Sequence, residues 1–139
     1  MPVADCFFHV IWTTKYRDQL ITPEIERRIF ARIIRKSMAL NSPVHAINGV
    51  ADHIHVAVSI STSLSVADWV KNVKGVSSHE VNATFNDLPT QFRWQSGYSV
   101  RTFAASALPV ICEYIARQKE HHREHTLIER LERVDDQPL

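Results

Sequence analysis

The sequence predicts an α+β fold of the ferredoxin-like, split βαβ type: an antiparallel sheet with helices on one face and an extra C-terminal helix. Segments typical of strands and helices follow one another in the order β-α-β-β-α-β, and a last helical pattern comes after them. The 139 residues, 45% hydrophobic and 22% charged, suit one globular domain. We therefore predict a single domain over residues 1–134 and a loose tail over residues 135–139.

The first strand and the first helix are expected within residues 6–43. Residues 6–14 (CFFHVIWTT) are rich in aromatic and β-branched types, which favour a buried strand. Thr22 followed by Pro23 predicts a helix start, because proline fits the first helical position. The helix should end near LNSP (40–43). Its apolar stripe recurs at helical spacing and comprises Ile25, Ile29, Ile33 and Leu40.

Two strands and a second helix follow. Residues 44–50 (VHAINGV) and 52–60 (DHIHVAVSI) both resemble strands and are joined by a short connection, which predicts a hairpin. Residues 65–68 (SVAD) fit a capping box at a helix start. Apolar residues then recur at helical spacing: Trp69, Val70, Val73 and Val76.

The last strand and the last helix are expected in the C-terminal third. A turn at Ser96-Gly97 precedes alternation through Tyr98, Val100 and Thr102, which predicts a strand. Ser106 and Pro109 mark the start of the last helix. Its apolar positions extend over one long pattern: Leu108, Ile111, Ile115, Leu127, Ile128 and Leu131.

Two histidines stand at the start of the strand at 52–60. Because successive side chains of a strand point to opposite faces, His53 and His55 share one face, while Ile54 and the β-branched residues after it share the other. With the helices on the apolar side, the histidines should lie on an open face that water and a ligand can reach. Two imidazoles about 7 Å apart at the backbone can converge on one metal ion. The spacing alone does not separate such a half-site from a chance pair.

Polar side chains form a stripe on the last helix. Tyr114 and Gln118 are four residues apart and therefore lie on one helix face, which His121 and His125 continue. The histidines of HHREH (121–125) are typical of an exposed polar helix end. A zinc site made from His121, His122 and His125 is the alternative interpretation.

Charge and composition exclude little and identify no partner. The net charge is +1, with 11 Lys/Arg against 8 Asp/Glu in residues 1–101 and 5 against 7 in residues 102–139. The two cysteines make a disulfide framework improbable. The N-terminus lacks a signal-peptide pattern, and no apolar run approaches the roughly 20 residues of a membrane span. We expect a cytoplasmic protein without a membrane partner.

Five short motifs follow one another along the chain: HVIWTTKYR (9–17), DHIHVAV (52–58), WVKNVKGVSS (69–78), WQSGYSV (94–100) and EYIARQ (113–118). In this order they resemble the HUH single-tyrosine transposases of the IS200 type, which move insertion sequences as single-stranded DNA. The family fold is a ferredoxin-like sheet with the tyrosine on a C-terminal helix, in agreement with the plan above. Ala51 departs from the family pattern, in which a proline commonly precedes the Asp-His pair.

The resemblance implies a role for four residues. His53 and His55, on either side of Ile54, would bind a divalent metal together with Gln118. Mg²⁺ is the implied ion, and imidazole ligands also suit Mn²⁺. Tyr114 would be the nucleophile that attacks single-stranded DNA, forms a 5′-phosphotyrosine and releases a 3′-hydroxyl. Reversal with another 3′-hydroxyl rejoins the strands.

The resemblance also implies partners. The family acts as a homodimer in which the tyrosine helix of one subunit completes the site of the other, on DNA hairpins at the element ends. Trp94 and Tyr98 could stack on bases or pack in the core. The chain continues about 20 residues past Gln118, beyond where many members end. Basic residues expected to contact phosphates are Lys15, Arg17, Lys71 and Lys74.

Three other functions fit parts of this pattern. A non-transposing module that binds DNA hairpins would keep every motif. An RNA-binding module on the same sheet is disfavoured, because the chain has no aromatic-rich strand of the GFGFV type. A metal-dependent phosphodiester hydrolase would use His53 and His55 to activate water, with Tyr114 only structural. That hydrolase would cut DNA without a covalent adduct.

Overall fold

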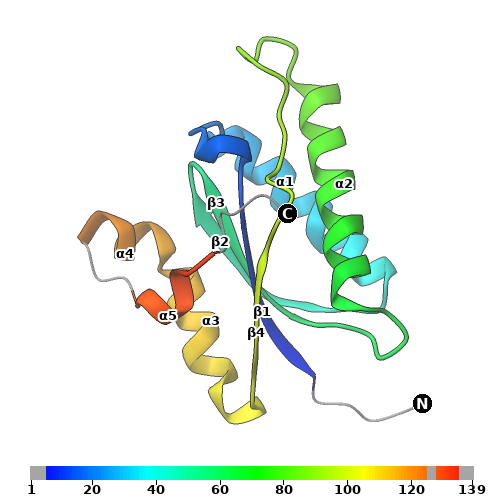
Figure 1. The fold of residues 1–139 in the computed structure, drawn as a ribbon, viewed down its shortest axis with the longest axis vertical. Helices are drawn as coiled ribbons and strands as arrows, with labels where there is room; N and C mark the ends of the chain where they lie inside the picture. The colour runs from blue at the N-terminus through cyan, green and yellow to red at the C-terminus, as the bar shows by residue number, and fades with distance from the viewer. Residues whose placement is uncertain (1–5, 125–127, 135–139) are drawn as a thin grey trace.

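Four antiparallel strands form the sheet at the centre of the computed structural model, which describes residues 6–124 and 128–134. The spatial order β2-β3-β1-β4 places β3 between β2 and β1, as the split βαβ plan requires (Figure 1). The predicted ferredoxin-like fold is confirmed. The bounds are β1 (Phe7–Thr13), β2 (Val44–Val50), β3 (His53–Ser59) and β4 (Ser99–Phe103).

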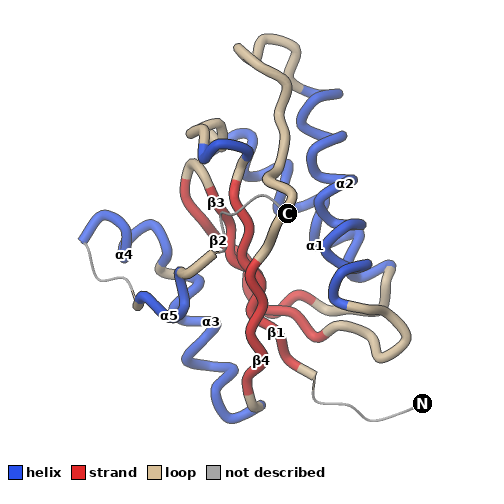
Figure 2. Tube along the Cα trace, in the orientation of Figure 1, coloured by secondary structure: helices blue, strands red, loops and turns tan. Residues whose placement is uncertain are grey.

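Helices α1 (Pro23–Ala39) and α2 (Val66–Thr84) cover one face of this sheet (Figure 2). Both start where the sequence predicts, because the Thr22 hydroxyl accepts a hydrogen bond from the Ile25 amide and the Ser65 hydroxyl accepts one from the Asp68 amide. The apolar side of the strands packs under them. Fifteen buried residues among those described form this main core, and Trp12, Ile54 and Trp69 are among its fully buried members.

The C-terminal segment differs from the predicted single helix in two ways. It forms three helices, α3 (Leu108–Ala116), α4 (Gln118–Glu124) and α5 (Glu129–Glu132), because Arg117 (φ −101°, ψ 21°) leaves helical geometry. These helices lie on the second face of the sheet, so the expectation of an open face is wrong for the described chain. The physical reason is a second, smaller core of Ala57, Ile111, Tyr114, Ile115 and Leu131. The predictions for His125, Leu127 and the tail at 135–139 fall outside the described residues.

Residues 85–98, between α2 and β4, are held along α2 by side-chain hydrogen bonds. The Asn82 amide donates to the Phe92 carbonyl (3.0 Å) and accepts from the Phe92 amide (2.9 Å). Trp94 donates from its indole nitrogen to the Ser77 hydroxyl and meets the Trp12 ring edge to face, so Trp94 packs in the core. Tyr98 packs partly against the same core. In the part of the chain that the structure describes, no helix has the length and apolar character to cross a bilayer.

Candidate metal and tyrosine site

Three histidines of neighbouring strands lie on the face of the sheet that α3–α5 cover. His53 and His55 alternate with Ile54 as predicted, and β1 places His9 beside them through the pairs Ile11↔His55 and His9↔Ala57. All three side chains are buried, and His55 has no exposed surface. The expectation that water reaches them freely is therefore wrong in this arrangement, because the C-terminal helices lie over them.

The ring of His53 is held in place by its neighbour Asp52. Its Nδ1 lies 2.7 Å from Asp52 Oδ1, which fixes the ring and leaves Nε2 to face the site. This Nε2 is buried and has no hydrogen-bond partner among the described residues. Burial opposes protonation of His53, but the hydrogen bond to Asp52 and the nearby negative charge of Glu132 outweigh it and raise its pKa. A buried imidazole nitrogen without a partner fits a divalent cation.

His55 lies between His9 and Glu132. Its Nδ1 is 2.9 Å from His9 Nε2, and its Nε2 is 3.1 Å from Glu132 Oε1. Burial lowers the pKa of both histidines, and with the charge on His55 it brings the pKa of His9 to about 3. His9 is therefore neutral at physiological pH, and it can orient the His55 ring by hydrogen bonding.

Tyr114 and Gln118 reach the same site although they belong to different helices. The Tyr114 ring centroid lies 6.3 Å from that of His55, and Gln118 is fully buried. The Tyr114 hydroxyl donates to Glu132 Oε2 and accepts from the Ile128 amide (3.1 Å). Burial and the Glu132 carboxylate raise the pKa of Tyr114 to about 12. The structure thus brings together all four residues for which the resemblance implies a role.

Two further residues close the site: His122, which the sequence suggested only for an alternative zinc site, and Glu132, which no prediction included. His122 Nε2 lies 3.2 Å from Gln118 Oε1. The Glu132 carboxylate accepts a hydrogen bond from Gln118 Nε2 at 2.9 Å. The prediction of an exposed helix end is wrong for His121 and His122, which are both half-buried. The His121 ring stacks on that of Tyr114, and the His122 ring lies tilted against that of His53, with 4.9 Å between centroids. The four-residue spacing from Gln118 could have indicated His122. No sequence signal points to Glu132.

A cavity lies beside this site, at the end of β1. It has a volume of about 590 Å³ and is lined by residues 13–17 and 94–96. Thr13, on its wall, pairs directly with His53 in the sheet. Tyr16 is 80% exposed there, with a left-handed backbone (φ 62°), and Lys15 Nζ lies 5.4 Å from its ring centroid. An aromatic face beside basic side chains suits a nucleobase and its phosphate.

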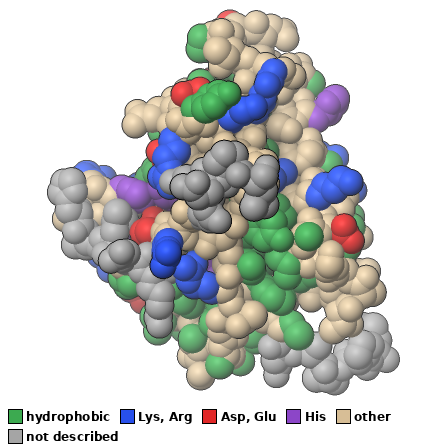
Figure 3. All heavy atoms as spheres, in the orientation of Figure 1, with side chains coloured by type: hydrophobic (Ala, Val, Ile, Leu, Met, Phe, Trp, Pro, Cys, Tyr) green, Lys and Arg blue, Asp and Glu red, His purple; other side chains and the backbone are tan. Residues whose placement is uncertain are grey.

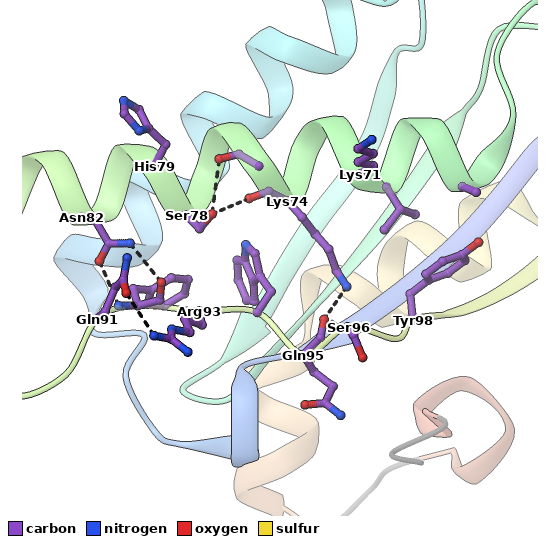
Figure 4. A pocket seen from close by; sticks show the side chains of 15 residues that line it. Lys71, Lys74, Ser78, His79, Asn82, Gln91, Arg93, Gln95, Ser96 and Tyr98 are labelled. Atoms are coloured by element: carbon purple, nitrogen blue, oxygen red, sulfur yellow. Dashed lines mark hydrogen bonds between the residues drawn. The ribbon is translucent and has the colours of Figure 1, made fainter. Parts of the chain in front are cut away.

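A second cavity, of about 710 Å³, separates α2 from residues 91–98 (Figure 4). Lys71 lines it, and Lys74 reaches across it to donate to the carbonyls of Gln95 (2.6 Å) and Gly97 (2.8 Å). Burial lowers the pKa of Lys74 to about 8. Lys74 therefore anchors the segment before β4. On the face of the molecule drawn in Figure 3, Lys and Arg side chains are spread over the surface and do not form one continuous strip.

Comparison with known proteins gives the family. A sequence model described as "Transposase IS200 like" matches residues 2–118. The transposase for insertion sequence element IS200 of Salmonella typhimurium is 32% identical over 124 residues, covering 86% of this chain and 80% of the relative. The ISDra2 transposase TnpA of Deinococcus radiodurans is 26% identical over 118 residues, covering 81% of this chain and 84% of the relative.

Two solved structures share the fold. A putative transposase from Deinococcus radiodurans superposes with a TM-score of 0.69 at 24% identity, covering 84% of this chain and 93% of that one. A REP-associated tyrosine transposase bound to a REP hairpin superposes with a TM-score of 0.64 at 9% identity, covering 91% of this chain and 73% of that one. With a family match over most of its length and a relative at 32% identity, the chain belongs to the IS200-like transposases.

Proposed function

We propose that this transposase cuts and rejoins single-stranded DNA by transesterification through a 5′-phosphotyrosine on Tyr114. The observation that carries the proposal is the meeting of one tyrosine hydroxyl with His53, His55 and Gln118 in a single buried site. A hydrolase that needs no tyrosine would not require its hydroxyl among the metal-binding candidates. The reaction would take place in the cytoplasm of a prokaryotic cell.

The chemistry balances without an external energy source. The Tyr114 oxygen forms a bond to phosphorus, the bond from phosphorus to the 3′-oxygen breaks, and the leaving oxygen takes up a proton. Because the pKa of Tyr114 is raised to about 12, the phenol is protonated at neutral pH and must lose its proton as the bond forms. The ester bond is kept in the intermediate, so a second 3′-hydroxyl can reverse the step.

His53, His55 and Gln118 are the proposed ligands of a divalent cation, Mg²⁺ or Mn²⁺. When bound, such an ion neutralises a non-bridging phosphate oxygen and orients the scissile phosphate. Asp52 and His9 hold the two imidazoles from behind through their Nδ1 atoms, at 2.7 and 2.9 Å. The direct test of the function is incubation with labelled single-stranded DNA from the flanks of the gene, followed by a search for a protease-sensitive adduct.

The proposed substrate is single-stranded DNA next to a hairpin. One structural relative is bound to a REP hairpin, and the cavity at residues 13–17 lies beside the proposed metal ligands. Lys15 and Arg17 would meet phosphates there, and Lys71 could do so in the groove along α2. Lys74 was expected to do the same, but its bonds to two carbonyls favour a structural role.

Replacing Tyr16 with alanine is expected to weaken binding of single-stranded DNA by roughly 5- to 150-fold, because stacking of a base on an aromatic ring contributes about 1–3 kcal/mol. Fluorescence anisotropy with a labelled oligonucleotide measures the change. Tyr16→Phe is the matched control and should bind like wild type, since it keeps the ring. Equal affinities of Tyr16→Ala and wild type would remove Tyr16 from the DNA surface.

The homodimer with an exchanged tyrosine helix also belongs to the proposal. In the described chain Tyr114 lies over the histidines of its own subunit. Exchange of α3–α5 between two copies would make the same contacts between subunits, as in domain swapping. A mixture of two inactive variants, described in the Discussion, separates the two arrangements.

A further inference from the structure

The carboxylate of Glu132 lies among three imidazole nitrogens. Its Oε1 is 3.1 Å from His55 Nε2, 3.4 Å from His53 Nε2 and 3.4 Å from His122 Nε2. The side chain is only 13% exposed. A buried carboxylate in such a position needs compensating positive charge or a bound cation.

These separations match those of atoms that share one metal ion. With ligand bonds of about 2.1 Å, neighbouring ligand atoms lie about 3.0 Å apart in an octahedron and about 3.4 Å apart in a tetrahedron. Oε1 and the nitrogens of His53 and His122 are among the donor atoms that lie within 4.8 Å of one another. His53 Nε2 has no hydrogen-bond partner in the described chain, so its 3.4 Å approach to Oε1 is not a hydrogen bond.

Packing holds Glu132 in this place. The preceding residue, Leu131, is buried against Ile111, Tyr114 and Ile115 in the second core. The Leu131 amide donates to the Ile128 carbonyl (2.9 Å), and the Ile128 amide donates to the Tyr114 hydroxyl. The short helix α5 is thus fixed to α3 from two sides, and its last residue points into the site.

Both His122 and Glu132 come from the part of the chain beyond the family match, which ends at residue 118. We propose that Glu132 is a further protein ligand of the divalent cation, supplied by this C-terminal extension, with His122 beside it. The proposal rests on the proposed function, because it assumes a cation at His53 and His55. It adds a hard carboxylate oxygen to the imidazole donors, a combination that suits Mn²⁺ and Mg²⁺ better than nitrogen alone.

The other oxygen of the same carboxylate ties the ligand to the nucleophile. Oε2 accepts hydrogen bonds from the Tyr114 hydroxyl and from Gln118 Nε2. A cation held by Oε1 would therefore also order Oε2 and, through it, the Tyr114 hydroxyl. Ion binding and the position of the nucleophile would be coupled by one side chain.

Isothermal titration of the full-length chain with Mn²⁺, without DNA, tests the proposal. Glu132→Gln keeps the shape and removes the charge, and should weaken Mn²⁺ binding by about tenfold or more. Glu132→Asp, which keeps the charge on a shorter stem, should fall between Glu132→Gln and wild type. Glu124→Gln is the matched control, because Glu124 is an exposed residue of α4, and should bind Mn²⁺ like wild type.

Two results would overturn the proposal. One is an unchanged Mn²⁺ affinity in both Glu132 variants. The other is a higher Mn²⁺ affinity in Glu132→Gln, which would mean that the carboxylate occupies the place of the ion and must be displaced by it. His53→Ala is measured in parallel to keep the two proposals apart. If only His53→Ala lost Mn²⁺ binding, Glu132 would be rejected as a ligand and the proposed metal site at His53 would be kept. Unchanged binding in His53→Ala would reject the site itself. Circular dichroism and the Tm of each variant confirm that it is folded.

Discussion

Tyr114→Phe is expected to lower strand cleavage by more than about 10⁴-fold and to abolish the covalent protein–DNA adduct. The substitution removes the only atom that the proposed reaction uses as nucleophile. It keeps the ring, which is buried in the second core and stacks on His121 at 4.5 Å between centroids. DNA binding should therefore stay close to wild type.

A denaturing gel with end-labelled single-stranded DNA and Mg²⁺ or Mn²⁺ measures both effects. Wild type should give a shifted band that protease removes, and Tyr114→Phe should give none. Cleavage without an adduct in both proteins would instead identify a metal-dependent hydrolase. Tight hairpin binding without cleavage by wild type would identify a non-transposing module.

His53→Ala is expected to lower Mn²⁺ affinity by more than about 100-fold and to abolish cleavage. Loss of a residue that only hydrogen-bonds to a metal ligand already lowers metal affinity by about 10- to 100-fold, and loss of the ligand itself should lower it further. His53 offers a buried nitrogen that has no hydrogen-bond partner among the residues described, and its ring is fixed from behind by Asp52. Titration with Mn²⁺ and the cleavage gel measure the two quantities separately.

His45→Ala provides the matched control. His45 is an exposed histidine of β2 that bonds the Ser59 hydroxyl away from the site. It should keep wild-type Mn²⁺ affinity and cleavage. If His45→Ala and His53→Ala were equally active, the pair on β3 would be excluded as a metal site.

Mixing the Tyr114→Phe and His53→Ala chains tests the exchanged dimer. If the tyrosine helix acts on the partner's histidines, half of the sites in a mixed dimer combine both intact parts and cleavage should return. If each subunit uses its own tyrosine, every site carries one defect and the mixture stays inactive. Mass spectrometry of the mixture confirms that mixed dimers are present before the gel is read.

The sequence predicted those parts of the fold that depend on local signals. The Thr22 and Ser65 caps locate the starts of α1 and α2, because each side chain satisfies an amide of the first turn. The two-residue period of a strand places His53 and His55 on the same face. Both inferences need only neighbours in the chain, and both are confirmed.

The C-terminal half of the site could not be predicted in this way. The helical pattern continues through residue 117, but Arg117 ends α3, and the sequence gives no capping signal for this break. Glu132 meets His55, 77 residues earlier in the chain, through the packing of α5 on the second core. Such a contact follows from tertiary structure and leaves no spacing to detect. The roles of His53, His55, Gln118 and Tyr114 stay predictions until the variants are measured.

The unequal size of the two cores has a consequence for turnover. Fifteen buried residues form the core under α1 and α2, whereas five form the one under the C-terminal helices, among the residues described. Local opening of the smaller unit therefore costs only part of the free energy of global unfolding. The C-terminal helices bury His53 and His55 on this side of the sheet, so DNA that approached from this side would need α3–α5 to open. The frequency of that opening would then set an upper limit on the rate at which strands can be exchanged.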